Sequence, residues 1–225
     1  GRMPQFEIIT TCTNLDLFRR SEGKRAADPA RAFRMGYVGA VGLWYLFGEA
    51  LDCFQGLREI EPGAQLVILN RGEHAYILER LAYHRVPHEC VELRAVEPAE
   101  VPEEMSNMDA GMFFLKPAHS KIASVPTKLG EFLGCGVPCL SNTGAGDVAS
   151  VLEGEGVGVA VEDFRWESLR EGLGRLLVLV RDPETPRRCR ETAERHFALE
   201  HGVRAYARIY QELGRGPNVV GREAE

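Results

Sequence analysis

Residues 110–147 read AGMFFLKPAHSKIASVPTKLGEFLGCGVPCLSNTGAGD and hold two strand patterns separated by a loop and a short helix. The apolar run at 112–115 predicts a buried strand, and a loop rich in lysine, histidine and serine follows it. Pro126 and Thr127 then begin a short helix that Gly136 ends, because proline is favoured just inside a helix start and glycine just past its end. The apolar residues after that glycine predict the next strand.

The beginning of this short helix is the best candidate for a ligand site. A helix N-terminus carries unpaired N–H groups and a partial positive charge, and both suit a phosphate. Thr127 and Lys128 would offer backbone N–H groups, and the Lys128 side chain would add a cation. Glu131, one turn later, could accept two hydrogen bonds from a ribose diol. We therefore predict that Ser124, Thr127, Lys128 and Glu131 bind a nucleotide diphosphate.

A purely structural interpretation of the same residues stays open. Glu131 can pair with Lys128 at i, i+3, and Ser124 can cap the helix. Lys121 lies in the preceding loop, where residues beside a ligand often carry function, and a solvated side chain is the alternative. Asp147 follows a glycine-rich turn, and we expect it to be the N-cap of the next helix.

Strand and helix patterns alternate along the rest of the chain, with a short strand and a loop expected over 5–20. Further strands are predicted at 33–41, 65–69, 90–93, 112–115, 137–140 and 158–161. Helices are predicted at 44–60, 73–84, 98–108, 127–135, 147–152, 162–181, 186–197 and 200–213. This alternation predicts an α/β fold, a Rossmann-like doubly wound parallel sheet of about six strands with helices on both faces. Such sheets bind ligands at the carboxyl ends of their strands, where the strand order reverses.

Composition narrows the possible partners. The chain has 225 residues, 44% of them hydrophobic, and a formal net charge of −6. The negative charge argues against nucleic acid or an anionic membrane as the main partner. No apolar run is long enough to span a bilayer, and no signal peptide is visible. The six cysteines form no CxxC pair and no histidine pair supports a metal site, so we expect reduced cysteines, no metal and a cytoplasmic location.

A second glycine motif ends the first predicted strand. Gly36, Gly39 and Gly42 would let backbone N–H groups approach a phosphate or a sugar, and we include Gly39 and Gly42 among the predicted nucleotide-sugar-binding residues. The spacing is not GxGxxG, and Asn70 and Arg71 stand where a dinucleotide fold has an acidic residue, so an NAD site is disfavoured. The alternative is a tight turn that packs strand on helix.

Together these motifs resemble the C-terminal, nucleotide-binding domain of GT-B fold glycosyltransferases. The chain is similar to the retaining enzymes of glycosyltransferase family 4, the glycosyl transferases group 1. In that family a glutamate is followed five positions later by glycine and seven positions later by proline, and Glu131, Gly136 and Pro138 match this pattern. The resemblance covers about residues 6–213 and implies one half of a GT-B fold.

The chain departs from the family in its charged residues. Ala123 stands in place of the first of two glutamates, the one that normally lies near the donor sugar. Ala40 and Tyr45 stand near the places of the arginine and lysine that bind the diphosphate. By resemblance the positive charge must come from elsewhere, and Lys121 and Lys128 are the candidates for stabilising the leaving group.

The resemblance implies three regions and one activity. Residues 1–32 would be a connector from a missing N-terminal domain, 33–213 the nucleotide-sugar-binding domain and 214–225 a polar tail. The intact enzyme would transfer a sugar from a nucleotide diphosphate-sugar to an unknown acceptor, with retention and without a cofactor or an obligatory metal. Acceptor binding, and any peripheral membrane contact, would belong to the missing half, so this chain alone should bind nucleotide weakly and transfer nothing.

Two other classes remain open at this point. A nucleotide-sugar epimerase of the same architecture would need acid and base groups that converge in a cleft, and the sequence shows no such set. A non-enzymatic nucleotide-binding module would keep the fold without transferring a sugar.

Overall fold

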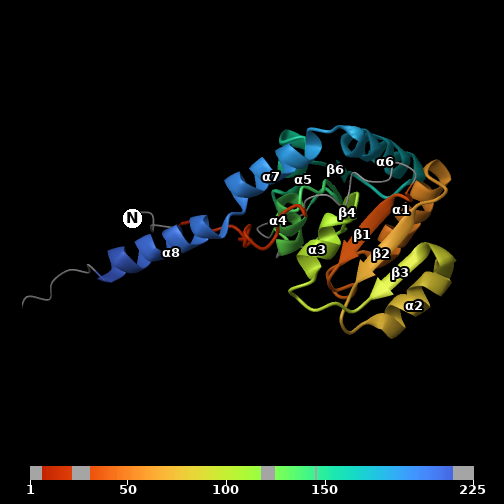
Figure 1. Ribbon diagram of the computed structural model, residues 1–225, viewed down its shortest axis with the longest axis horizontal. Helices are drawn as coiled ribbons and strands as arrows, with labels where there is room; N and C mark the ends of the chain where they lie inside the picture. Colours follow the sequence, from red (N-terminus) through yellow and green to blue (C-terminus); the bar gives the residue numbers. More distant parts are fainter. Residues whose placement is uncertain (1–6, 22–30, 118–124, 145, 215–225) are drawn as a thin grey trace, which may run out of the picture.

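The computed structural model describes residues 7–21, 31–117, 125–144 and 146–214. Within them the strands are β1 (Arg34–Val38), β2 (Gln65–Leu69), β3 (Val91–Arg94), β4 (Ala110–Met112), β5 (Cys139–Asn142) and β6 (Gly158–Val161). All neighbouring pairs are parallel, in the order β3-β2-β1-β4-β5-β6 (Figure 1). The chain runs outward from β1 to β3 and then returns to place β4 beside β1. The predicted doubly wound sheet is confirmed, and its strand order reverses between β1 and β4.

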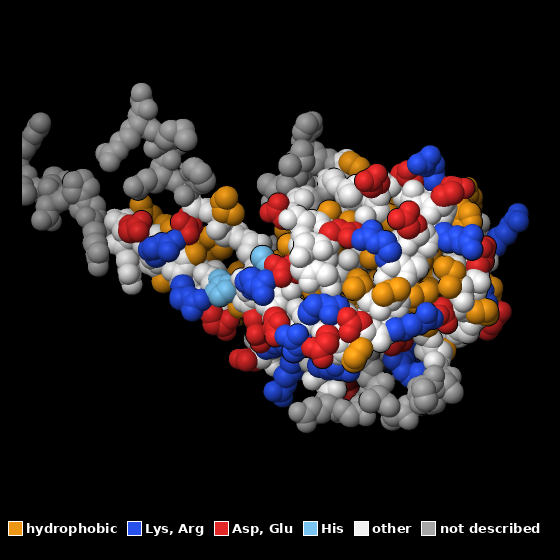
Figure 2. All heavy atoms as spheres, turned by 90° about the horizontal axis from the view of Figure 1, so that it is seen from above, with side chains coloured by type: hydrophobic (Ala, Val, Ile, Leu, Met, Phe, Trp, Pro, Cys, Tyr) orange, Lys and Arg blue, Asp and Glu red, His pale blue; other side chains and the backbone are white. Residues whose placement is uncertain are grey.

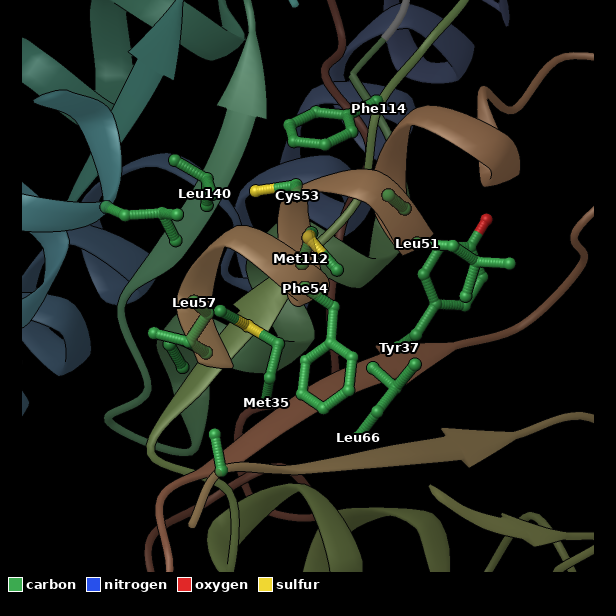
Figure 3. Packing of buried hydrophobic residues seen from close by; sticks show 14 of the residues in the cluster. Met35, Tyr37, Leu51, Cys53, Phe54, Leu57, Leu66, Met112, Phe114 and Leu140 are labelled. Atoms are coloured by element: carbon green, nitrogen blue, oxygen red, sulfur yellow. The ribbon is translucent and has the colours of Figure 1, made fainter. Parts of the chain in front are cut away.

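Helices cover both faces of this sheet. They are α1 (Phe47–Ile60), α2 (His74–Tyr83), α3 (Val101–Ser106), α4 (Thr127–Gly134), α5 (Val148–Gly154), α6 (Trp166–Arg181), α7 (Thr185–His196) and α8 (Leu199–Gly214), with a short 3₁₀ helix at His88–Cys90. Residues of α1, α2 and α6 fill one core, and residues of α3, α4, α5 and α7 fill the other. Successive side chains of β1 point to opposite faces of the sheet, so Tyr37 lies in the first core and Val38 in the second. Figure 3 shows Tyr37 and Leu66 packed with Phe54 of α1.

The fourth strand lies earlier in the chain than the sequence predicted. The apolar run at 112–115 is buried, but regular pairing ends at Met112. Beyond it the side chain of Asn142 replaces a neighbouring strand, since its Oδ1 accepts from the N–H of Leu115 at 2.8 Å and its Nδ2 donates to the Leu115 carbonyl at 3.0 Å. The run is therefore buried throughout, but only Met112 belongs to the regular ladder of β4.

The strand predicted within 5–20 is wrong for the described residues of that segment. Residues 7–20 contain only an isolated bridge, from Thr13 to Ala198. The N–H of Thr13 donates to the carbonyl of Phe197 at 2.6 Å, so this segment pairs with the junction of α7 and α8 and not with the sheet. Domain boundaries at 32 and 214 stay predictions, since 22–30 and 215–225 lie outside the described residues.

Helix α4 is fixed closely against the sheet and against α7. A Cβ on Gly111 of β4 would lie 2.6 Å from atoms of the Phe132 ring on α4, so the glycine makes room for that ring. At the other end Gly136 has φ +71°, as expected for the residue after a helix end. Arg190 of α7 donates to the carbonyl of Gly134 at 3.4 Å and to that of Phe18 at 3.0 Å. These contacts determine where the N-terminus of α4 lies.

Helix α8 extends away from the sheet (Figure 1). Its apolar side chains Val203, Tyr206, Tyr210 and Leu213 are exposed. Over the face drawn in Figure 2, acidic and basic side chains lie intermingled and do not form a patch of one sign. Among the described helices none combines the length and apolar character needed to cross a bilayer.

Candidate functional site

The candidate site lies at the reversal of strand order between β1 and β4. The segment after β1 folds across the end of β4: the N–H of Leu46 donates to the carbonyl of Phe114 at 3.0 Å, and Tyr45 forms an antiparallel bridge with Leu115. The first turn of α4 reaches the same place, because a Cβ on Gly39 would lie 3.6 Å from the Nζ of Lys128. Three segments distant in sequence therefore meet where this fold binds ligands.

Lys128 is the central charged residue of the site. It is only 6% exposed, and its Nζ has no hydrogen-bond partner among the described residues. The Nζ lies 3.9 Å from the ring centroid of Tyr45 and 5.2 Å from that of Tyr37. Burial lowers the pKa of this amine from 10.5 to about 7, although the negative charges of Glu131 and Glu73 act in the opposite direction. Such an amine is available for an anion that enters the site.

The first turn of α4 keeps its hydrogen-bond donors open. The N–H of Leu129 donates to the carbonyl of Pro126 at 3.1 Å, whereas the N–H groups of Thr127 and Lys128 make no hydrogen bond to the part of the chain described here. The N-cap is Pro126, and no side chain of the described ranges makes a capping hydrogen bond to this helix. Two amide dipoles and a buried amine thus converge at one helix start.

Glu131 lies one turn further along α4 and is half-buried. Burial raises the pKa of its carboxyl group, and the positive charge of Lys128 partly counters that rise. Neither a hydrogen bond nor an ion pair joins Glu131 to Lys128 within the described ranges, so the structural pairing that the sequence allowed is not formed here. The carboxylate remains an acceptor for a bound hydroxyl group.

The glycine turn after β1 is organised differently from the expectation. The N–H of Gly39 donates to the carbonyl of Leu69 at 2.9 Å. The N–H groups of Val41 and Gly42 donate to the carboxylate of Glu73 at 3.1 and 3.2 Å. Asn70 donates to the carbonyl of Gly39 at 3.0 Å and to Glu73 at 2.9 Å. The N–H groups of Gly39, Val41 and Gly42 thus have partners within the protein, and ligand binding by Gly39 and Gly42 stays a prediction.

Gly39 nevertheless has a clear role in shaping the site. Its φ of +97° lies in a region that residues with a side chain rarely adopt. A Cβ here would lie 3.6 Å from the Lys128 ammonium nitrogen, an ordinary van der Waals contact, so space alone does not require a glycine. The backbone conformation is what favours glycine at this position.

A cavity of about 420 Å³ adjoins this turn at the ends of β1, β2 and β3. Its lining is mostly apolar and includes Val38, Leu69, Val96, Pro98 and Val101. Polar groups of Asn70, Arg71 and Glu73 stand around it. Gly39 borders the cavity and also lies beside the Lys128 amine, so the cavity lies next to the start of α4. An apolar pocket with a few polar groups suits a planar ring system.

Another cavity, of about 470 Å³, lies between α5, α6 and the end of β6. Glu153, Glu162 and Glu171 line it with a single arginine, Arg175, which is paired with Glu153. An excess of carboxylates repels a diphosphate, so this cavity is a poor candidate for a nucleotide.

The remaining predicted residues are accounted for as follows. Lys121 and Ser124 lie outside the described residues, so their roles stay predictions. Asp147 is the N-cap residue of α5 as expected, but its side chain makes no capping hydrogen bond. Sequence reasoning missed Tyr37 and Glu73, because no local pattern shows that residues of β1 and α2 meet Lys128.

Solved structures with similar folds include several glycosyltransferases. The chain matches sucrose-phosphate synthase from Thermosynechococcus elongatus with a TM-score of 0.71 and 18% identity, over 92% of this chain and 52% of that one. It matches Anabaena HepE in complex with UDP and glucose with a TM-score of 0.65 and 15% identity, over 91% of this chain and 55% of that one. The C-terminal domain of LpcC, a glycosyl transferase group 1 family protein from Francisella tularensis, matches with a TM-score of 0.62 and 11% identity. The match covers 83% of this chain and 99% of that one.

Comparison with protein-family models and with curated protein sequences gives no match. The chain spans about half the length of the sucrose-phosphate synthase and HepE chains, and nearly the whole of the separate LpcC domain. The resemblance read from the sequence is confirmed at the level of the fold: this chain has the fold of a glycosyltransferase domain, as in the C-terminal domain of a group 1 enzyme.

Proposed function

We propose that the chain is the donor-binding domain of a glycosyltransferase that transfers a sugar from a nucleotide diphosphate-sugar to an acceptor. The observation that carries this proposal is the buried amine of Lys128, which has no hydrogen-bond partner among the described residues, together with the first two N–H groups of α4, which likewise have none there. A buried cation without a counter-ion is costly, and a bound anion removes most of that cost. The location at the strand reversal supports the same conclusion.

The parts of a nucleotide diphosphate fit the site in one direction. The diphosphate would lie at the start of α4, against the N–H groups of Thr127 and Lys128 and the Lys128 amine. Glu131 would accept hydrogen bonds from the ribose hydroxyls. The base would enter the apolar cavity bordered by Gly39, at the ends of β1, β2 and β3. The structures of HepE and of the pneumococcal O-GlcNAc transferase GtfA, both in complexes that include UDP, support this ligand class.

The chemistry follows from the charge that develops on the leaving group. As the glycosidic bond breaks, negative charge accumulates on the departing diphosphate. Fixed amide dipoles and an ammonium group in a water-poor site stabilise that charge without reorganising. Lys128 would supply the cation in this chain, with Lys121 as a second candidate. Retention at the anomeric carbon follows from the family resemblance, and acceptor groups would come from a second domain.

A thermal-shift screen with UDP, GDP, ADP and CMP tests this function. We expect one nucleoside diphosphate to raise the melting temperature and its nucleoside to do so much less, because binding to the folded state stabilises it. A protein that responds to none of these ligands, up to millimolar concentration, contradicts the proposal. CMP serves as the monophosphate control.

Replacement of Glu131 by alanine should weaken binding of that diphosphate by about 1.5–3 kcal/mol, because the ribose loses a charged hydrogen-bond acceptor. Isothermal titration calorimetry measures the change. The control is Glu131→Gln, which keeps an acceptor oxygen and should lose less affinity. Equal affinity of the alanine variant and the parent protein would show that Glu131 does not contact the ribose.

A further inference from the structure

Lys128 is held in the site by aromatic rings and not by a carboxylate. The groups that face its amine are Tyr37 of β1, Tyr45 of the following segment, Glu73 at the start of α2 and Glu131 of α4. Neither carboxylate forms an ion pair with the amine within the described residues. The Tyr45 ring is the nearer of the two rings, at 3.9 Å. An aromatic face attracts a cation without neutralising it.

Tyr45 is fixed from its backbone. Its N–H donates to the carbonyl of Gly42 at 3.3 Å, and its bridge partner is Leu115. On either side, the carbonyl of Trp44 accepts from the N–H of Lys116 at 2.9 Å, and Leu46 donates to Phe114. The ring is thus attached to the end of β4, while Lys128 comes from α4. Contact between them orients the amine relative to the sheet.

We propose that Tyr45 is a positioning residue for the donor site: its ring holds the Lys128 amine toward the diphosphate subsite and places no counter-charge there that would compete with the ligand. This inference rests on the proposed function, since it assigns the diphosphate to Lys128. A carboxylate at the same distance would hold the lysine equally well but would cancel its charge. The ring instead leaves the N–H donors of the amine free for phosphate oxygens.

A consequence is that ligand binding changes the protonation of Lys128. The pKa of the buried amine is about 7, so at pH 8 most empty sites hold the neutral form. A bound diphosphate favours the ammonium form and raises this pKa, so the site takes up about one proton per nucleotide at pH 8. We expect removal of the Tyr45 ring to admit water to the amine, which would raise its pKa from the value in the parent protein and reduce the uptake.

The first experiment needs no ligand. The sequence has four lysines, Lys24, Lys116, Lys121 and Lys128, so protein labelled with ¹³C at the lysine side chains gives few signals, and the Lys128→Met variant identifies the one of interest. We expect an apparent pKa near 7 in the parent protein and in Tyr45→Phe, and a rise of more than one pH unit in Tyr45→Ala. An unchanged titration in Tyr45→Ala overturns the proposal.

The second experiment measures affinity. The probe is whichever of UDP, GDP and ADP gives the largest thermal shift, compared with its nucleoside by calorimetry at pH 8 in buffers of different ionisation enthalpy. Tyr45→Ala should lose at least tenfold in diphosphate affinity together with the proton uptake, while nucleoside binding stays and Tyr45→Phe retains both. Tyr83→Ala is the matched control, because it removes the exposed ring over which Arg80 lies at 4.7 Å.

The outcomes separate the two proposals. If the parent protein binds no nucleoside diphosphate, the proposed function fails, and the lysine titration still decides whether Tyr45 holds the amine. If Lys128→Met loses diphosphate affinity but Tyr45→Ala does not, the function stands and the role of Tyr45 is wrong. Loss of affinity in Tyr45→Phe equal to that in Tyr45→Ala also overturns the inference, since the hydroxyl group would then be responsible.

Discussion

Lys128→Met should make the empty protein more stable, by about 4 kcal/mol at pH 7, and should at the same time remove its preference for diphosphates over nucleosides. A pKa lowered from 10.5 to about 7 means that the folded state disfavours the ammonium form. At 1.36 kcal/mol for each pH unit between the two values, the full cost is roughly 5 kcal/mol. Methionine fills similar space without a charge, so it avoids this cost.

The pH dependence of this effect has a definite sign. Between pH 7 and 10.5 the unfolded chain binds more protons at Lys128 than the folded chain does, so this residue makes stability rise with pH. Its cost is complete below pH 7 and disappears near pH 10.5. The stability gap between Lys128→Met and the parent protein should therefore narrow as the pH rises.

Urea unfolding of both proteins at pH 6, 7.5 and 9 measures the gap directly. Lys116→Met is the matched control, because Lys116 is exposed, and it should leave stability nearly unchanged. A Lys128→Met variant less stable than the parent at pH 6, or a gap independent of pH, would show that the amine is not buried as described. Calorimetry with the diphosphate and its nucleoside then tests the loss of selectivity.

Gly111→Ala should destabilise the protein by about 3 kcal/mol and weaken nucleotide binding as well. The added methyl group would lie within 2.7 Å of three atoms of the Phe132 ring. Overpacking of a close-packed interior typically costs about 1–3 kcal/mol. We expect a cost near the upper end here, because a rigid ring is in contact with the sheet. Phe132 is fully buried, so we expect the methyl group to push α4 away from the sheet and to displace the amides that begin the helix.

Gly174→Ala is the control for this substitution. Gly174 lies within α6, exposed, and a Cβ there would meet nothing within 4 Å. Alanine in a helix interior is favoured over glycine, so this variant should gain about 0.5–1 kcal/mol. Thermal and urea unfolding compare the two variants. If Gly111→Ala kept the parent's stability and nucleotide affinity, α4 would not be the rigid support that its packing indicates.

The sequence predicted the layers of the fold well, because alternation and turn residues are local. The strand at 158–161 matches β6, and α4 begins at Thr127 as expected. The fourth strand was predicted too late in the chain because the apolar residues continue past Met112. Where the regular pairing ends depends on the side chain of Asn142, 27 positions after Leu115. A pattern of hydrophobic residues does not show where a side chain replaces a strand.

The candidate site was predictable only in part, for the same reason. The start of α4 could be found from proline, lysine and glutamate spacing. The surroundings of Lys128 could not, since Tyr37, Tyr45 and Glu73 come from three other segments that only the fold brings to it. The sequence shows only that Tyr45 stands near the place of a lysine of the family. The role of Tyr45 depends on the contact of its ring with Lys128, and this contact is not visible in the sequence.

The hydrogen bonds from the glycine turn to the carboxylate of Glu73 affect how a ligand would bind. A loop held by its own acidic side chain is already in shape before any nucleotide arrives, so no ordering entropy is spent there. Two of its N–H groups are already bonded to the Glu73 carboxylate, and Lys128 is the buried cation among the described residues of the site. Accordingly, we expect the salt sensitivity of nucleotide affinity to reflect a single buried ammonium group.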